Sequence, residues 1–185
     1  ARDLRDRLRE AVAGVDLGLV VSNAGRYGFG RFLDARLEDE LDGLDVNARA
    51  PLVLAHEFAQ RLAARGRGGM IFLSSSSAYQ GTPFAAGYGA AKAHTLALAE
   101  ALAYELEPFC VDVLAVCPGP VATGIAREAL RWSQPLLDPV MSAFFASPDE
   151  AALPVVHLAC ASALEDKTGL YYHRWRAKPP APLAL

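Results

Sequence analysis

Short apolar runs alternate with longer stretches of helical periodicity along this chain of 185 residues. The first three apolar runs end at turns that contain glycine, serine or proline, which is typical of buried strands in a parallel sheet. The predicted strands cover residues 17–21, 70–73, 111–116 and 169–173. The predicted helices cover residues 1–13, 37–65, 86–107 and 148–163. Strands that alternate with helices in this way predict an α/β fold, a doubly wound parallel sheet with helices on both faces.

Polar or turn-forming residues directly follow the first three predicted strands. Asn23 follows the first strand, Ser75 the second, and Pro118-Gly119 the third. Because ligands bind outside the carboxyl ends of the strands in such sheets, we expect these residues to lie together at one edge. The Pro-Gly pair could also serve only to end its strand.

Composition and charge narrow the class of protein further. The chain is 52% hydrophobic and 21% charged, which predicts one compact domain over residues 1–185. A net charge of -3 without a basic block argues against nucleic acid as a partner. No apolar run is long enough to span a bilayer. Four scattered histidines predict no metal site. Three cysteines without paired spacing fit a reducing cytoplasm: Cys110, Cys117 and Cys160.

Tyr88 and Lys92 are the first candidates for chemistry. They stand four residues apart in a predicted helix, so the phenol and the ammonium share a face. A neighbouring ammonium favours the phenolate and is expected to lower the tyrosine pKa from about 10. Such a tyrosine can exchange a proton near neutral pH, and a serine from the run Ser74–Ser77 could hydrogen-bond the same substrate oxygen. These groups suit carbonyl–alcohol interconversion, although Tyr88 could instead be an amphipathic core residue.

Five short motifs occur in order along the chain. Tyr88 and Lys92 form Tyr-x-x-x-Lys, and Ser75 precedes Tyr88 by 88 − 75 = 13 residues. The other three are Ser22-Asn23-Ala24-Gly25, Asn47 within Asp45-Val46-Asn47-Ala48, and Pro118-Gly119-Pro120-Val121-Ala122-Thr123. Over essentially the whole chain, these motifs resemble those of the short-chain dehydrogenase/reductase (SDR) family. The family has an Asn-Asn-Ala-Gly turn, a helix asparagine and a Pro-Gly-x-Val-x-Thr loop at the corresponding places. The resemblance implies a Rossmann-like sheet.

The resemblance also implies a catalytic tetrad of Asn47, Ser75, Tyr88 and Lys92. Tyr88 would be the general acid in reduction and the base in oxidation. Lys92 would lower its pKa and hold the nicotinamide ribose. Ser75 would polarise the substrate carbonyl; its neighbours Ser74 and Ser76 would point to the other face of an extended strand. Asn47 would kink its helix and hold a water, or could be an ordinary buried polar residue.

The resemblance implies NAD or NADP as cofactor and a small alcohol or ketone as substrate, and the apolar segment 121–147 favours a substrate of apolar character. The implied cofactor-binding residues are Asn23, Ala24, Gly25, Tyr88, Lys92, Pro118, Gly119, Val121 and Thr123. The bulky apolar segment 121–147 is expected to be a substrate lid, or else ordinary packing. A homodimer or homotetramer is expected through the helices 37–65 and 86–107, where small residues permit close packing.

The family's strand–glycine-rich turn–helix, which holds the pyrophosphate, does not occur in the chain. Relative to the family, the chain begins roughly 60 residues late, about two βαβ lengths, so we expect it to lack the first βαβ portion of a longer protein. Residues 25–30 have the spacing Gly-x-x-Gly-x-Gly and are interpreted as a turn on the substrate side. The alternative function is a catalytically inactive SDR-like relic or an oligomerisation module. An epimerase or dehydratase is less favoured, because those enzymes carry larger substrate domains.

Overall fold

The structure is a computed structural model that describes residues 2–119, 148–160, 171–173 and 176–178. Three strands form a parallel sheet in the order β1 (Leu19–Ser22), β2 (Gly68–Leu73) and β3 (Val111–Val116). Val20 pairs with Met70, and Phe72 pairs with Ala115, so the carboxyl ends of the three strands meet at one edge. The predicted α/β fold with a parallel sheet is confirmed.

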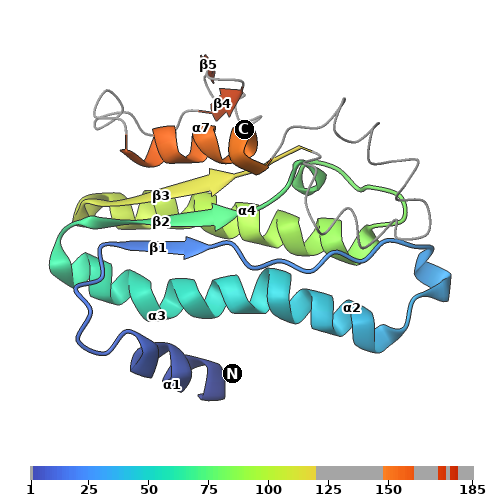
Figure 1. The fold of residues 1–185 in the computed structure, drawn as a ribbon, viewed down its shortest axis with the longest axis horizontal. Helices are drawn as coiled ribbons and strands as arrows, with labels where there is room; N and C mark the ends of the chain where they lie inside the picture. The colour runs from blue at the N-terminus through green and yellow to red at the C-terminus, as the bar shows by residue number, and fades with distance from the viewer. Residues whose placement is uncertain (1, 120–147, 161–170, 174–175, 179–185) are drawn as a thin grey trace.

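Helices flank this sheet (Figure 1). They are α1 (Arg2–Ala11), α2 (Leu37–Leu44), α3 (Ala50–Arg65), α4 (Ala86–Leu106) and α7 (Pro148–Cys160). The core lies where α3 and α4 cover the sheet, and its buried side chains are Val20, Ala55, Phe58, Leu62, Met70, Phe72, Ala99, Leu106 and Val111. Met70 and Phe72 share this face because alternate residues of a strand point the same way.

The turn between α3 and β2 depends on two glycines. Gly66 ends α3 in the left-handed conformation, with φ of 71°, and its N–H caps the carbonyls of the last turn. Gly68 has φ of 141°. A Cβ on Gly68 would lie 2.7 Å from Leu62 Cδ2 and 2.8 Å from the Gly18 carbonyl oxygen. Only glycine therefore lets β2 begin this close to α3 and to Gly18, the residue before β1.

A buried carboxylate fastens α1 to α3. Arg5 Nε and Arg9 Nε donate to the carboxylate of Glu57 at 3.2 and 2.6 Å. The hydrogen bond from Arg9, helped by that from Arg5, holds the pKa of Glu57 below its ordinary value although burial opposes this. The first helix is thus attached to the core through one acidic side chain.

The structure differs from the sequence prediction at two places. The single helix predicted over 37–65 is interrupted by a π-helical turn, Asp45–Arg49 (η2), between α2 and α3. The strand predicted over 169–173 does not join the parallel sheet: β4 (Tyr171–His173) pairs antiparallel with β5 (Arg176–Lys178) in a separate ribbon. β4 can pair antiparallel with β5 because the two strands are neighbours in the sequence, whereas a parallel partner would require a crossover connection.

Three short 3-10 turns also were not predicted: Phe32–Asp34, Ser76–Ala78 and Glu107–Phe109. Segment 121–147, with the predicted lid, lies outside the described residues, as does the predicted end of the helix at 161–163. Among the described helices, none combines the length and the apolar character needed to cross a membrane.

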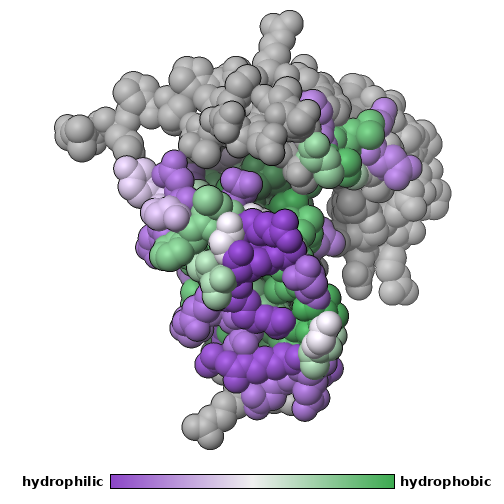
Figure 2. All heavy atoms as spheres, turned by 90° about the vertical axis from the view of Figure 1, so that its left-hand side faces the viewer, coloured by the Kyte–Doolittle hydropathy of each residue, from purple (hydrophilic) through white to green (hydrophobic). Residues whose placement is uncertain are grey.

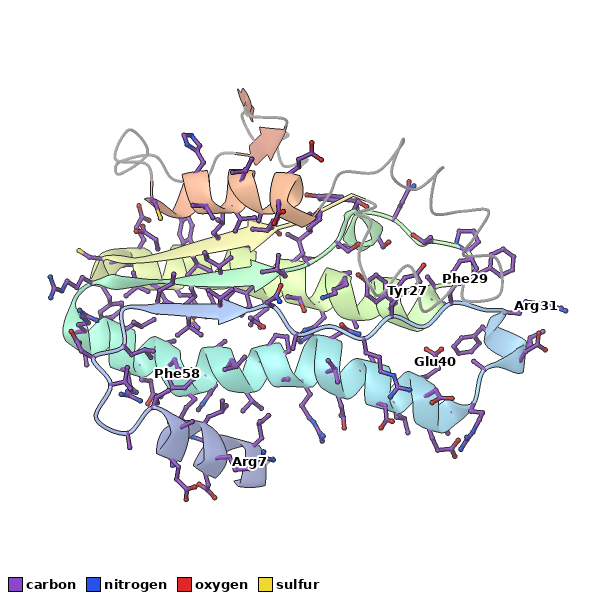
Figure 3. All side chains as sticks on the ribbon, in the orientation of Figure 1. Arg7, Tyr27, Phe29, Arg31, Glu40 and Phe58 are labelled. Carbon is purple, nitrogen blue, oxygen red and sulfur yellow. The ribbon has the colours of Figure 1, made fainter. Side chains whose placement is uncertain are left out.

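The two ends of the sheet differ in character. Figure 2 views the end at which the strands begin, and hydrophilic residues dominate the lower part of that face, with apolar residues scattered among them. The opposite end, toward which the strands point, carries aromatic side chains that include Tyr27 and Phe29 (Figure 3). The predicted site residues follow the strands at this second end.

Candidate active site

The loops that follow β2 and β3 are joined by backbone hydrogen bonds. The Ser74 N–H donates to the Val116 carbonyl at 2.7 Å, and the Ser76 N–H donates to the Pro118 carbonyl at 2.9 Å. The serine run and the start of the Pro-Gly loop therefore lie side by side at the carboxyl edge of the sheet. The Pro118 carbonyl, just after the end of β3, thus anchors the serine loop.

The serines of the run point to different partners. Ser74 is buried, and its Oγ donates to the Lys92 carbonyl at 2.7 Å. Ser75 Oγ accepts from the Ser77 N–H at 3.1 Å and caps the 3-10 turn. Ser75 also hydrogen-bonds the Tyr88 side chain. Ser75 is therefore the serine that the fold brings to Tyr88, while Ser74 secures the start of α4.

Tyr88 and Lys92 lie on the same side of α4, but the pKa of the phenol does not move as expected. Burial raises the pKa of Tyr88, and the hydrogen bond to Ser75 lowers it by a smaller amount. Lys92 Nζ lies 5.7 Å from the centre of the Tyr88 ring and donates to the Leu73 carbonyl at 2.8 Å. The expectation that Lys92 lowers the pKa of Tyr88 is wrong for this arrangement, because desolvation of the phenol dominates.

Lys92 is itself desolvated, with only 4% of its surface exposed. Burial lowers its pKa, and the nearby Cys117 acts in the opposite direction. The Leu73 carbonyl accepts a hydrogen bond from one of its three N–H groups. The other N–H groups of the Lys92 ammonium are available to a hydrogen-bond acceptor on the side of the loop after β1.

Asn47 sits at the centre of the π-helical turn and is 1% exposed. Its amide holds the backbone of one residue: the Arg26 N–H donates to Oδ1 at 3.1 Å, and Nδ2 donates to the Arg26 carbonyl at 2.6 Å. Thr95 Oγ1 donates to the Asn47 carbonyl at 2.7 Å, which ties the turn to α4. Turns of this type are frequent at functional sites. Here the side chain is aimed at the loop after β1.

Gly25 lets that loop approach the candidate tetrad. A Cβ at Gly25 would lie 3.3 Å from Asn47 Oδ1 and 3.5 Å from Lys92 Nζ. The backbone after β1 therefore passes directly beside the buried ammonium. Asn23 and Ala24 precede it in the same loop and are exposed.

The structure thus brings Asn47, Ser75, Tyr88 and Lys92 to the same edge as residues 23–25 and 118–119. Val121 and Thr123 lie outside the described residues. Among the parts of the chain that the structure describes, no group of three or more His, Cys, Asp or Glu side chains could hold a metal ion.

Sequence reasoning missed the residues that surround this edge. The Arg26 guanidinium bonds Asp39 and Asp42, each at 3.0 Å. Tyr27 packs edge-on against the Tyr88 ring, with ring centres 4.7 Å apart. The sequence did contain a signal for both contacts. Asp39 and Asp42 are three residues apart and so lie on the same face of a helix, and Tyr27 and Phe29 are two apart and so lie on the same side of an extended segment.

The fold and the site define a class: an α/β protein with a parallel sheet and a Ser–Tyr–Lys group at its carboxyl edge. The sequence model of the family described as short chain dehydrogenase matches residues 2–134. The chain therefore belongs to the short-chain dehydrogenase/reductase family, as the motifs predicted.

Two curated relatives and one solved structure illustrate the likeness. The chain is 34% identical over 154 residues to an L-rhamnose 1-dehydrogenase (NAD(P)(+)) of Azotobacter vinelandii, a match that covers 81% of this chain and 59% of that protein. It is 30% identical over 130 residues to the inactive hydroxysteroid dehydrogenase-like protein 1 of Homo sapiens, covering 69% and 39%.

The solved structure is that of a candidate NAD(P)-dependent gluconate 5-dehydrogenase from Beutenbergia cavernae, with NADP bound at low occupancy. It superimposes with a TM-score of 0.74 at 27% identity, covering 87% of this chain and 66% of that one. The chain thus spans less than two thirds of the length of each of these three proteins.

Proposed function

We propose that the protein is an NAD(P)-dependent oxidoreductase that interconverts a secondary alcohol and a ketone by hydride transfer. The observation that carries the proposal is the hydrogen bond between Ser75 and Tyr88, formed beside the buried Lys92 at the carboxyl edge of the sheet. Two hydroxyl groups that converge in this way can bind one carbonyl oxygen. The family and the names of the relatives support the same class of reaction.

The protein residues have distinct tasks in this reaction. Because burial raises the pKa of Tyr88, its phenol is protonated at neutral pH and can donate to the oxygen of a ketone during reduction. Ser75 donates a second hydrogen bond to that oxygen and fixes its direction. In oxidation Tyr88 takes the proton from the alcohol, and the hydrogen bond to Ser75 favours the phenolate that this step needs.

The residues after β1 and β3 fit a nicotinamide dinucleotide, NAD or NADP. Lys92 has N–H bonds free to meet the ribose hydroxyls, and the loop after β1 passes beside it at Gly25, where a Cβ would lie 3.3 Å from Asn47 Oδ1 and 3.5 Å from Lys92 Nζ. Asn23, Ala24, Pro118 and Gly119 would line the same loops. When bound, the dinucleotide supplies or accepts the hydride. The protein orients the substrate and handles the proton.

Replacement of Tyr88 by phenylalanine in the full-length protein tests the proposal. We expect kcat to fall by roughly 10²- to 10⁴-fold, since the proton donor is removed, while the circular dichroism spectrum is unchanged. Tyr104→Phe is the matched control on the same helix, because Tyr104 is 83% exposed. If Tyr88→Phe retains the activity of the control, Tyr88 is not the acid and base.

The second candidate function is a catalytically inactive SDR-like protein. It is favoured by the likeness to the inactive hydroxysteroid dehydrogenase-like protein 1. A fluorescence titration with NADH and NADPH separates the two. Saturable binding supports the enzyme, and no binding of either supports the inactive protein.

The proposal includes a place of action and an assembly. Free thiols at Cys110, Cys117 and Cys160 suit the cytoplasm. A homodimer or homotetramer would use the exposed side of α4, where Ala90 and Ala97 lie, together with α2 and α3. Sedimentation of the full-length protein as a monomer at micromolar concentration would contradict the assembly.

A further inference from the structure

Four aromatic rings form a row that begins at Tyr88. Tyr27 contacts Tyr88 at a centre distance of 4.7 Å and an angle of 80°. Phe29 stacks with Tyr27 at 6.2 Å and 16°, and Phe84 meets Phe29 at 5.8 Å and 52°. Figure 3 shows Tyr27 and Phe29 side by side, alongside the first turns of α4. Phe29 and Phe84 are 55% and 53% exposed, so the outer half of the row presents ring surface.

Two separate loops are fixed to build this row. The Gly30 N–H donates to the Phe84 carbonyl at 2.8 Å, which joins the loop after β1 to the loop before α4. Phe84 has φ of 66°, a left-handed conformation that is rare for an aromatic residue and that clusters at ligand sites. Asn47 holds the backbone of Arg26, and α2 holds its guanidinium, so the position of the residue before Tyr27 is fixed.

The row is apolar in character. Burial and the neighbouring Tyr88 both raise the pKa of Tyr27, so its phenol is uncharged at neutral pH. The charged side chain directly before Tyr27, that of Arg26, is directed to Asp39 and Asp42 on α2 and is paired there. Ring faces in this setting bind other rings by offset or edge-on contacts.

We propose that Tyr27, Phe29 and Phe84 bind the ring portion of the substrate, and that the substrate is a ketone or secondary alcohol whose reacting carbon lies in or next to an apolar ring. When the carbonyl oxygen of a substrate is hydrogen-bonded to Tyr88, the groups on its carbonyl carbon lie beside Tyr27, because the Tyr27 ring is in direct contact with Tyr88. A second fused ring then reaches Phe29. This inference rests on the proposed function, and it names the substrate class of the same site.

The proposal is tested on the full-length protein with two ketones: 1-tetralone, which carries two fused rings, and 2-butanone, which is small and acyclic. Phe29→Leu and Tyr27→Leu keep an apolar side chain and remove the ring. An aromatic contact contributes roughly 2- to 12-fold in affinity. We therefore expect each variant to lower the ratio of kcat/KM for 1-tetralone over 2-butanone by a factor in this range. Phe109→Leu, at the other end of the sheet and half exposed, is the matched control and leaves the ratio unchanged.

A binding measurement makes the test independent of turnover. Saturation-transfer NMR of 1-tetralone detects contact with the protein, and we expect the signal to weaken in Phe29→Leu and not in Phe109→Leu. Phe29 is exposed, so its replacement does not endanger folding as that of Tyr27 could. Equal signals in both variants, or an unchanged ratio, overturn the proposal. So does a preference of the unaltered protein for L-rhamnose over 1-tetralone. Turnover that is absent with every substrate refutes the proposed function instead, while the NMR comparison still decides the ring contact.

Discussion

Replacement of Asn47 by alanine should loosen the loop that leads into the aromatic row. The amide makes two hydrogen bonds, at 3.1 and 2.6 Å, to the backbone of Arg26. A typical hydrogen bond contributes about 1 kcal/mol net, so loss of both removes about 2 kcal/mol. Where the Arg26 N–H and carbonyl stay out of reach of water, the loss rises to roughly 4 kcal/mol, since an unpaired buried group costs about 1–3 kcal/mol.

The free energy of unfolding, measured by urea denaturation of the full-length protein, checks this value. Asn23→Ala is the matched control, because Asn23 is the other asparagine of the chain and is exposed. The control should change stability by less than about 0.5 kcal/mol. Near-ultraviolet circular dichroism should change in Asn47→Ala alone, since the Tyr27 ring loses its fixed approach to Tyr88.

If Asn47→Ala unfolds within about 0.5 kcal/mol of the unaltered protein, with the aromatic signal retained, the amide does not anchor the loop. The π-helical turn would then have to be explained by its backbone contact with Thr95, whose Oγ1 bonds the Asn47 carbonyl.

Two further predictions concern stability away from the site. Gly68→Ala should destabilise the protein by roughly 2–4 kcal/mol, because its φ of 141° and the Gly18 carbonyl oxygen, 2.8 Å from the position of a Cβ, both oppose a side chain. Chemical denaturation measures this change, and Gly28→Ala, in open space, is the control. For Glu57, a pKa below the ordinary 4.5 means that its stabilising effect is complete above that pH and is lost as the pH falls through the lowered value. Thermal melts from pH 7 to pH 3 should show Glu57→Gln less stable at pH 7 and less dependent on pH, and parallel curves for the two proteins would contradict this.

Much of the fold and part of the site could be predicted from local patterns. The strands β1, β2 and β3 were predictable because each is an apolar run that stops at a turn former. Their parallel direction follows from the helices that connect them, and it places residues 23–25, Ser75 and Pro118 at one edge of the sheet. The alternation of side chains along a strand also separated Ser75 from Ser74, since period-two geometry is fixed by the pleat.

The rest depended on contacts between segments far apart in sequence. No local pattern indicated that Asn47 would hold Arg26, 21 residues away, or that the turn around it would be π-helical. The short ribbon of β4 and β5 was also missed, because three-residue strands carry too little periodicity to identify.

Local spacing was enough to predict that Tyr88 and Lys92 share a helical face and that Ser75 faces the same edge, because helical and pleated geometry are properties of the local backbone. The surroundings of those side chains depend instead on the folded chain. Packing around Tyr88 raises its pKa, where spacing alone predicted a lower one, and the row from Tyr27 to Phe84 exists only because two loops meet. Desolvation and ring contact both depend on which surfaces are brought together, and that is set by the folded chain as a whole.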